Sequence, residues 1–379
     1  MRVYLDNAAT TPIAKEVLEV MIPILSNEFG NPSSTHFYGR QSKASIETSR
    51  IKIAKLLNCE PAEIIFTSGG TEADNMALCA SVHQLEVTRI ITTKIEHHAV
   101  GHTVEALQKS DNIKVDYVKI DEKGNVDLKD LESLLDSNEK TLVSLMHANN
   151  EIGTLLPIER VNQLCKKYNA LFHSDTVQTM GHYNFNLKEL DIDFITGAAH
   201  KFHGPKWVGF LYINKRNKAN PLIHGGAQER GLRGGTENVY GIVGLAKALE
   251  LAYADIKTHQ KHVQELKSFM IKELSKTFNN LSFHGEIAPE KSLYTVLNVC
   301  FPNNQKSGML LFTLYLKGIA CSGGSACSSG ANKGSHVLEG IKADQTRPNV
   351  RFSFSRYTSM EEIRYAIDVI KETFETVLA

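Results

Sequence analysis

The sequence predicts an α/β protein built on a largely parallel β-sheet, followed by a smaller α+β domain. Between about residues 60 and 215, short runs rich in β-branched residues alternate with stretches of helical periodicity. The runs are apolar almost throughout, as expected of strands covered on both faces, and strand–helix alternation is typical of parallel sheets. Seven such runs are present: 63–68, 89–95, 114–120, 141–149, 171–176, 193–199 and 209–214.

Helical periodicity fills the gaps between these runs. It begins at Thr71 after the first run and at His98 after the second. Further helices are expected at 128–135 and 158–168, after the third and fourth runs. A helix that crosses over the sheet returns the chain to the same edge, so successive strands run parallel. Ligands of such sheets bind beyond the carboxyl ends of the strands, and the residues there are the candidates for function.

The remainder of the chain mixes strands and helices. A helical pattern over residues 238–278 is long enough to bridge two domains or to bend between them. Ser359 and Glu362 form a capping-box pattern at the start of the last helix. Strands are expected at 281–285, 294–301 and 349–355, and helices at 308–318 and 360–378. At 379 residues the chain can build a large core and a second, smaller one. We predict a large domain over residues 14–250 and a small domain formed by residues 1–13 and 251–379.

The composition is that of an ordinary globular enzyme. Apolar residues make up 42 %, charged residues 22 %, and the formal net charge is zero. A neutral chain offers no basic field for nucleic acid and no polybasic surface for a membrane. The start of the chain lacks the apolar stretch of a signal peptide, and no apolar run approaches the ~20 residues of a membrane helix. We expect a cytoplasmic protein that binds neither nucleic acid nor membrane.

The six cysteines are too few and too scattered for a disulfide framework. Four lie in apolar segments, where a small buried side chain is expected: Cys59, Cys79, Cys165 and Cys300. Cys321 and Cys327 lie instead in a glycine- and serine-rich stretch, GIACSGGSACSSGANKG, at 318–334. Their spacing fits neither a CxxC redox motif nor ordinary zinc ligands. By itself the stretch is compatible with a disulfide, a metal site, a linker or a mobile loop carrying one reactive thiol.

Two of the strand ends carry glycine or histidine. Gly70 and Thr71 follow the first run at the start of a helix, where free N–H groups suit a phosphate, although Gly-Gly-Thr is also a good helix cap. His97 follows the second run and could stack on a planar ligand or move protons. His98 and His102 would share a helix face as metal ligands, but no third ligand has suitable spacing.

The later strand ends carry charged and amide groups. Asn150 follows the fourth run, and Asp175 and Gln178 close the fifth. His200 and Lys201 follow the sixth. A lysine at an apolar strand end either reaches solvent or is desolvated, which suits it to a Schiff base. Together with a carboxylate for a pyridinium nitrogen and a phosphate-binding helix start, Lys201 indicates pyridoxal phosphate.

At these residues the chain resembles the cysteine desulfurases, within the class V branch of fold-type I pyridoxal-phosphate aminotransferases. The resemblance covers almost the whole chain, in family order. The matching blocks are 4–12 (YLDNAATTP), 29–36 (FGNPSSTH), 64–75 (IIFTSGGTEADN), 95–100 (IEHHAV), 146–153 (MHANNEIG), 173–178 (HSDTVQ), 200–206 (HKFHGPK), 224–239 (HGGAQERGLRGGTENV), 322–330 (SGGSACSSG) and 350–356 (VRFSFSR).

The resemblance implies a role for each residue that faces the cofactor ring. Lys201 would carry pyridoxal phosphate covalently. Asp175 would pair with the pyridine nitrogen, and Gln178 would bind the ring hydroxyl. His97 would stack on the ring as an acid/base, and Asn150 belongs to the cofactor- and substrate-binding set.

The resemblance also implies how the two anionic groups are held. Gly70, Thr71 and His200 would bind the cofactor phosphate, joined by Thr236 from the partner subunit of a homodimer. Arg351 would bind the substrate carboxylate, where guanidinium geometry allows two parallel hydrogen bonds.

Two positions depart from the family pattern. Ala198 replaces the serine that many relatives direct at the phosphate, which removes one hydroxyl contact of about 1 kcal/mol. Trp207 replaces a glycine in the run after the lysine and would reshape the entry or a dimer contact.

The implied reaction converts L-cysteine to L-alanine. Cys327 would take the sulfur as a persulfide and pass it to an acceptor, such as a scaffold protein for iron–sulfur clusters. A mobile loop at about 319–334 would carry Cys327 between cofactor and acceptor. Cys321 follows an apolar pair and is interpreted as structural, with a reversible Cys321–Cys327 disulfide as the alternative. The alternative function is that of a selenocysteine lyase or another class V aminotransferase. A more remote alternative is a non-catalytic thiol or metal-binding protein.

Overall fold

The computed structural model describes residues 1–303, 309–323 and 334–375 of the chain. Its centre is a seven-stranded sheet in the order β2-β8-β7-β6-β5-β3-β4. β8 runs antiparallel to its neighbours β2 and β7, and the other neighbouring strands are parallel. The strands are β2 (Ile64–Thr67), β3 (Arg89–Thr92), β4 (Lys114–Tyr117), β5 (Thr141–Ser144), β6 (Leu171–Asp175), β7 (Phe194–Ala198) and β8 (Gly209–Ile213). The predicted mostly parallel sheet is confirmed.

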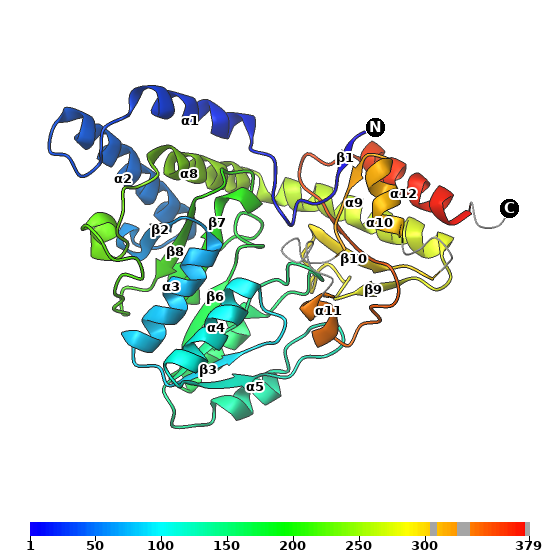
Figure 1. The fold of residues 1–379 in the computed structure, drawn as a ribbon, viewed down its shortest axis with the longest axis horizontal. Coiled ribbons are helices and arrows are strands. Elements are labelled where there is room, and N and C mark those ends of the chain that lie inside the picture. The colour runs from blue at the N-terminus through cyan, green and yellow to red at the C-terminus, as the bar shows by residue number, and fades with distance from the viewer. Residues whose placement is uncertain (304–308, 324–333, 376–379) are drawn as a thin grey trace.

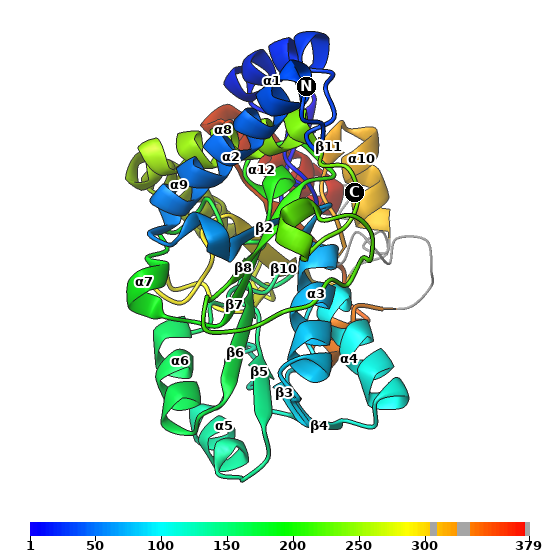
Figure 2. The same cartoon turned by 90° about the vertical axis from the view of Figure 1, so that its left-hand side faces the viewer.

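Helices cover both faces of this sheet. Figure 2 shows α3 (Gly70–His83) and α4 (His98–Ser110) on one side. On the other side lie α5 (Leu128–Leu135), α6 (Ile158–Lys167) and α7 (Leu187–Leu190). The burial of the strands on both faces explains their near-continuous apolar sequence. Two further helices, α1 (Lys15–Asn27) and α2 (Phe37–Leu57), pack against α8. Single turns of 3₁₀ helix occur at Pro61–Glu63 and Ala199–Lys201, and Gln228–Gly231 forms a turn in which Glu229 and Arg230 have positive φ.

The helical pattern predicted over residues 238–278 is two helices. α8 (Val239–Ala254) ends where Asp255 adopts the non-helical angles φ −140° and ψ 37°, and α9 (Ile256–Thr277) begins directly after it. α8 packs on the large sheet, whereas α9 packs on α12 (Met360–Glu375). In Figure 1 the pair links the two parts of the molecule, so the expected helix bends rather than running straight.

The second part of the chain builds a small three-stranded sheet. β10 (Val296–Cys300) pairs antiparallel with both β9 (Ser282–His284) and β12 (Asn349–Ser353). The last helix begins as its capping box predicts, because the Ser359 and Glu362 side chains each accept a hydrogen bond from the other's backbone N–H. The remaining helices of this part are α10 (Leu310–Leu316) and α11 (His336–Gly340).

The N-terminal residues belong structurally to this second part. β1 (Val3–Tyr4) pairs in parallel with β11 (Ile319–Ala320), far along the chain. Val3 and Leu5 are buried in the same apolar cluster as Val263 and Ile370, whereas Ala252 belongs to the cluster beneath the large sheet. The domain boundaries at residues 14 and 250 stay a prediction. No helix in the described part of the chain is long and apolar enough to span a membrane.

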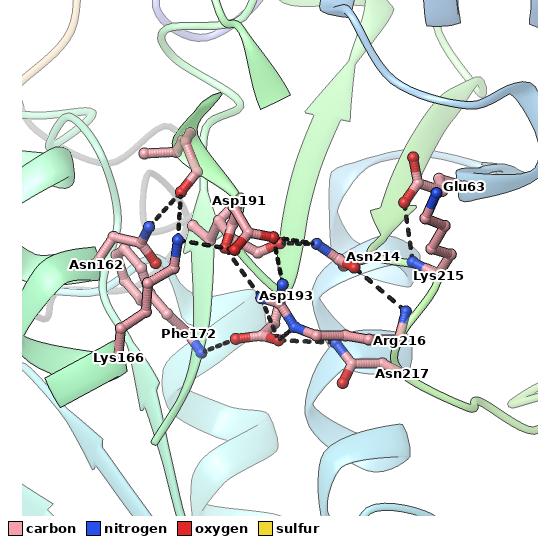
Figure 3. Close-up of polar contacts among 12 residues, drawn as sticks. Glu63, Asn162, Lys166, Phe172, Asp191, Asp193, Asn214, Lys215, Arg216 and Asn217 are labelled. Carbon is pink, nitrogen blue, oxygen red and sulfur yellow. Dashed lines mark hydrogen bonds and ion pairs between the residues drawn. The ribbon is translucent and has the colours of Figure 1, made fainter. Parts of the chain in front are cut away.

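A polar network fixes the edge of the large sheet where β6 and β7 begin (Figure 3). Asp193 is buried there and accepts hydrogen bonds from the Phe172 N–H (2.9 Å), Arg216 Nε (3.0 Å) and Asn217 Nδ2 (2.9 Å). Asp191 joins Lys166 of α6 to Asn214, which follows β8. Because three neighbouring strands are tied at this edge, the side chains at their opposite ends are held on a rigid base.

Candidate active site

A cavity of about 240 Å³ lies beyond the carboxyl ends of the parallel strands, as the fold class predicts. Its walls come from the large sheet, from the N-terminal segment and from β12 of the small sheet. Ten of the residues singled out in the sequence line it: Gly70, Thr71, His97, Asn150, Asp175, Gln178, Ala198, His200, Lys201 and Arg351.

Lys201 lies at the end of the short turn that follows β7. Its Nζ donates hydrogen bonds to the carbonyl oxygens of Ala8 (2.6 Å) and Ala9 (2.9 Å). Gln178 Nε2 donates to the same Ala8 oxygen at 3.0 Å. The N-terminal segment is therefore one wall of the cavity and holds the lysine amine and the glutamine amide side by side.

Asp175 ends β6 and is 6 % exposed. One carboxylate oxygen accepts a hydrogen bond from the backbone N–H of Val177 at 2.8 Å. Burial, and then the charge of Asp74, raises the pKa of Asp175 to about 7. A cation placed against this carboxylate would favour its charged form, so the site is suited to a protonated ring nitrogen.

Asp74 is a residue of this site that the sequence did not single out. It lies in the first turns of α3, is 1 % exposed and lines the cavity. Its Oδ1 is 3.4 Å from Nε2 of His173 and has no hydrogen-bond partner among the described residues. Burial raises the pKa of Asp74 to about 8. Asp74 follows an alanine on a helix that packs on the sheet. The one sequence signal that could have identified Asp74 is a charged residue at a helix position where a buried apolar residue is expected.

Glu96 adds a third buried carboxylate next to the cavity. Its two oxygens accept hydrogen bonds from the Thr93 hydroxyl (2.8 Å) and the Met146 N–H (2.9 Å). Burial raises the pKa of Glu96 to about 8, and the charges of Asp175 and Asp74 act in the same direction. Three carboxyl groups this close and this buried cannot all be ionised without a compensating cation.

His97 caps the N-terminus of α4 beside the same cavity. Its Nδ1 accepts a hydrogen bond from the Ala99 N–H at 3.2 Å, so the neutral ring carries its proton on Nε2. Burial, and then the positive charge of Lys201, lowers the pKa of His97 to about 4. Ligand atoms of Asp74, His97 and Asp175 lie within 4.8 Å of one another, a spacing that a metal ion could also use.

His98 and His102, considered above as metal ligands, lie outside this cavity. Their rings stack with 4.8 Å between centroids, and the ring of His336 is 4.4 Å from that of His98. His336 also reaches the carbonyl oxygen of Glu96 at 2.9 Å. These contacts join α4 to α11 of the small domain.

The other end of the cavity suits a phosphate. Gly70 and Thr71 begin α3, whose free N–H groups and dipole favour an anion. A side chain at position 70 would meet Val177 Cγ2 at 2.7 Å, so glycine keeps this approach open. His200 Nδ1 is 3.2 Å from the Thr10 hydroxyl, and burial lowers the pKa of His200 to about 3. The Ala198 methyl lies in the wall without a hydroxyl, as the sequence indicates.

Arg351 on β12 closes the cavity from the small domain. Its Nη1 donates to the Asn150 carbonyl oxygen and its Nη2 to Asp6 Oδ1, both at 2.9 Å. Arg351 Nε and Asn150 Oδ1 are buried, and neither has a hydrogen-bond partner among the described residues. An unpaired buried donor on a guanidinium is suited to a carboxylate ligand.

Thr236 and Trp207, which the sequence also highlighted, do not line this cavity. Cys327 and most of the predicted mobile loop lie outside the described residues. The chain enters that segment beside Arg351, because Ser322 and Arg351 exchange backbone hydrogen bonds of 3.3 and 2.7 Å. Thr236 is exposed and does not line the cavity. Trp207 is 79 % exposed, so its ring faces away from the core.

Cys321 differs from an activated thiol. It is free and half-buried and packs against the core of the small domain. Burial, and then the charge of Asp6, raises the pKa of the Cys321 thiol to about 12. A thiol that stays protonated is a poor nucleophile, which agrees with the structural interpretation.

Comparison with known proteins gives one consistent result. The aminotransferase class-V family matches residues 3–365. Cysteine desulfurase IscS of Dictyoglomus turgidum is 43 % identical, covering 98 % of this chain and 94 % of its own. Putative cysteine desulfurase IscS 1 of Bacillus subtilis is 41 % identical, covering 98 % and 99 %. A solved NifS-like protein superposes with a TM-score of 0.91 at 40 % identity, over 99 % of this chain and 100 % of its own.

The cavity fits the cofactor of this family. It presents a lysine amine, a buried carboxylate, an unobstructed helix N-terminus and an imidazole around one space. These are the groups that hold a Schiff-base carbonyl, a ring nitrogen, a phosphate and a ring face. The chain therefore belongs to the aminotransferase class-V family of pyridoxal-phosphate enzymes, within its cysteine desulfurase branch.

Proposed function

We propose that this protein is a pyridoxal-phosphate-dependent cysteine desulfurase that forms L-alanine and transfers sulfur through Cys327. One observation carries the proposal: Lys201, Asp175 and Arg351 converge on one cavity, and the segment that leads to Cys327 is paired with Arg351. A solved relative, SspA in complex with cysteine, supports cysteine as the substrate. That relative superposes with a TM-score of 0.80 at 32 % identity, over 94 % of this chain and 100 % of its own.

Each residue of the cavity has a task in this reaction. Bound pyridoxal phosphate supplies an electron sink for the carbon that carries the substrate amine. Lys201 would anchor the cofactor, and its Nζ would take the Cα proton of the substrate. Asp175 holds the ring nitrogen in its protonated form, and Gln178 binds the ring hydroxyl. His97 covers the ring and carries a proton on Nε2.

The anionic groups are held at opposite ends of the cavity. Gly70, Thr71 and His200 bind the phosphate. Arg351 binds the substrate carboxylate, and Asn150 lies beside it. We assign the remaining phosphate contact to Thr236 of the partner subunit, because Thr236 is exposed and away from the cavity of its own chain. A homodimer follows from that assignment.

Sulfur transfer takes place at Cys327. Its thiolate attacks the substrate sulfur, so an S–S bond forms while the C–S bond breaks. The electron pair of the broken bond stays with the carbon fragment, which takes up a proton and leaves as alanine. The persulfide is then consumed by an acceptor thiol, such as that of an iron–sulfur scaffold protein. Thiol chemistry of this kind requires a reducing compartment, which supports a cytoplasmic location.

The test is a parallel measurement of alanine and sulfide released from L-cysteine, with dithiothreitol as acceptor. We expect equal amounts of both products from the wild type and neither from Cys327→Ser, while that variant keeps the visible absorbance of the bound cofactor. Release of a keto acid instead of alanine would identify an aminotransferase. Turnover confined to selenocysteine would identify a selenocysteine lyase.

A further inference from the structure

A second cavity is lined by residues next to the lysine in sequence, Phe202 and His203. It has a volume of about 20 Å³ and shares no lining residue with the cofactor cavity. His182 and His203 of the large domain form one side, and Ser355, Arg356 and Thr295 of the small domain form the other. His182 Nε2 is 3.3 Å from the carbonyl oxygen of Lys201. The cavity therefore lies where the lysine segment meets the small domain.

The cavity carries an uncompensated positive charge. Arg356 forms no ion pair within the described part of the chain, and its buried Nε has no hydrogen-bond partner there. Its guanidinium lies 5.0 Å from the ring centroid of Tyr357. The lining contains three imidazoles and no carboxylate. A guanidinium that is partly buried, with a buried Nε and no counter-charge, favours an anion in the cavity beside it.

The positive charge of Arg356 also affects the pKa values of the neighbouring histidines. Burial, with Arg356 adding to it, lowers the pKa of His182 to about 4 and that of His203 to about 3. The pKa of His259 is also lowered, by burial first and by Arg356 second. Asp255 opposes this shift at His259, but with a smaller effect than Arg356. The histidines are thus neutral at pH 7 and leave Arg356 as the cation of the cavity.

We propose that this cavity binds one monatomic anion of the size of chloride, held by the Arg356 guanidinium and the Ser355 hydroxyl. The volume of about 20 Å³ accommodates a water-sized particle, which favours a small anion over a phosphate. Ser355 Oγ accepts a hydrogen bond from the Tyr357 N–H at 3.2 Å, which leaves its O–H to donate to the anion. The imidazole of His182 is already engaged with Tyr294 and Lys201, so it shapes the cavity wall.

Such an anion would tie the two domains together at the back of the active site. One side of it would contact Arg356, five residues after the substrate-binding Arg351 in sequence. The other side would rest against His182, which touches the backbone of Lys201, and His203, which donates from Nδ1 to the Pro12 carbonyl oxygen at 2.8 Å. Binding would therefore stabilise the assembled domain junction without entering the chemistry.

The test measures the melting temperature of the holoenzyme in sodium chloride and in sodium gluconate at equal ionic strength. Bound cofactor fills the phosphate site, so that site does not contribute. We expect chloride to raise the melting temperature by about 1–3 °C over gluconate. The difference should vanish in Arg356→Gln and persist in Arg364→Gln, which removes an exposed arginine of α12. An equal chloride effect in both variants would overturn the proposal.

A second measurement uses the wild type together with a more conservative variant. The ³⁵Cl NMR line of dilute chloride should broaden with holoenzyme and narrow again on addition of bromide, and Ser355→Ala should weaken the broadening. A line width equal to that of a chloride-free control protein, or competition by sulfate as effective as that by bromide, would overturn the assignment to a monatomic anion.

Discussion

Asp6 Oδ1 lies 2.9 Å from Nη2 of Arg351, so the arginine assigned to the substrate carboxylate is already paired with a carboxylate of the protein. Arg351 is 1 % exposed, and the pair joins the N-terminal segment to β12. The guanidinium still has Nε available. Asp6 therefore orients the guanidinium and at the same time adds negative charge where the proposed function places the substrate carboxylate.

Replacing Arg351 by lysine should raise KM for cysteine roughly ten- to hundredfold, because one directed hydrogen bond to a charged group is worth about 1.5–3 kcal/mol. Asp6→Asn is the matched control: it keeps the arginine and removes the competing charge, so KM should stay equal or fall. Steady-state kinetics on both variants measures KM for cysteine and tests this prediction. If Asp6→Asn raised KM as much as Arg351→Lys, Asp6 would be an essential anchor and not a competitor.

Asp175→Asn should lower the affinity for pyridoxal phosphate by about two to three orders of magnitude, since it leaves a protonated ring nitrogen without its buried partner. The measurement is the dissociation constant of cofactor from the apoprotein, followed by visible absorbance. Asp74→Asn is the control, because it changes a second buried carboxyl of the same cavity. If both variants lost the same affinity for pyridoxal phosphate, Asp175 would not be the only carboxylate that pairs with the ring nitrogen.

Asp74 should make the cofactor-free protein less stable as the pH rises. Its pKa is raised from an ordinary value near 4 to about 8, so the folded protein holds a proton that the unfolded chain releases. The stabilising effect of this proton is fully present below about pH 4 and is lost as the pH rises to about 8. The melting temperature should therefore fall less between pH 5 and pH 9 in Asp74→Asn than in the wild type. Parallel curves would show that Asp74 ionises normally.

Lys201→Ala should abolish covalent attachment of the cofactor while the cavity still binds it. After treatment with borohydride, the wild type should gain the mass of reduced pyridoxal phosphate and the variant should not. Fluorescence titration of the variant should still report cofactor binding through the phosphate and ring contacts. Covalent labelling of Lys201→Ala would assign the attachment to another lysine, and the buried Lys267, whose pKa burial lowers to about 7, would be examined first.

The two loop cysteines should respond differently to alkylation. The raised pKa of Cys321 keeps its thiol protonated at pH 8, so iodoacetamide should modify it slowly. Cys321→Ser should retain desulfurase activity within about twofold, in contrast to Cys327→Ser. Peptide mapping by mass spectrometry gives the order of labelling. Rapid modification of Cys321 in the native protein would contradict a structural role.

The fold and most of the cavity could be predicted because their signals are local. Asp175 and Lys201 each follow an apolar strand directly, and the parallel sheet brings those strand ends together. Asp74 was missed because its meaning depends on what it faces: nothing in the helix sequence shows that His173 is 3.4 Å away. The Asp6–Arg351 pair joins two segments from opposite ends of the chain, and no local pattern encodes such a contact. The bend at Asp255 was left open, since a helical pattern continues through it.

The pairing of β1 with β11 has a consequence for the order in which the protein assembles during synthesis. Asn7 donates a hydrogen bond to the carbonyl oxygen of Ser353, 346 positions later. Strand β1 leaves the ribosome long before β11, the strand with which it pairs among the described residues, so this pairing must wait until residues 319–320 have been made. Ala8, whose carbonyl oxygen accepts from the lysine amine, also donates its N–H to the Ser353 hydroxyl at 2.8 Å, and that contact can form only once Ser353 has been made as well. The large sheet can thus form early, whereas a closed cofactor pocket is a late, post-synthetic event.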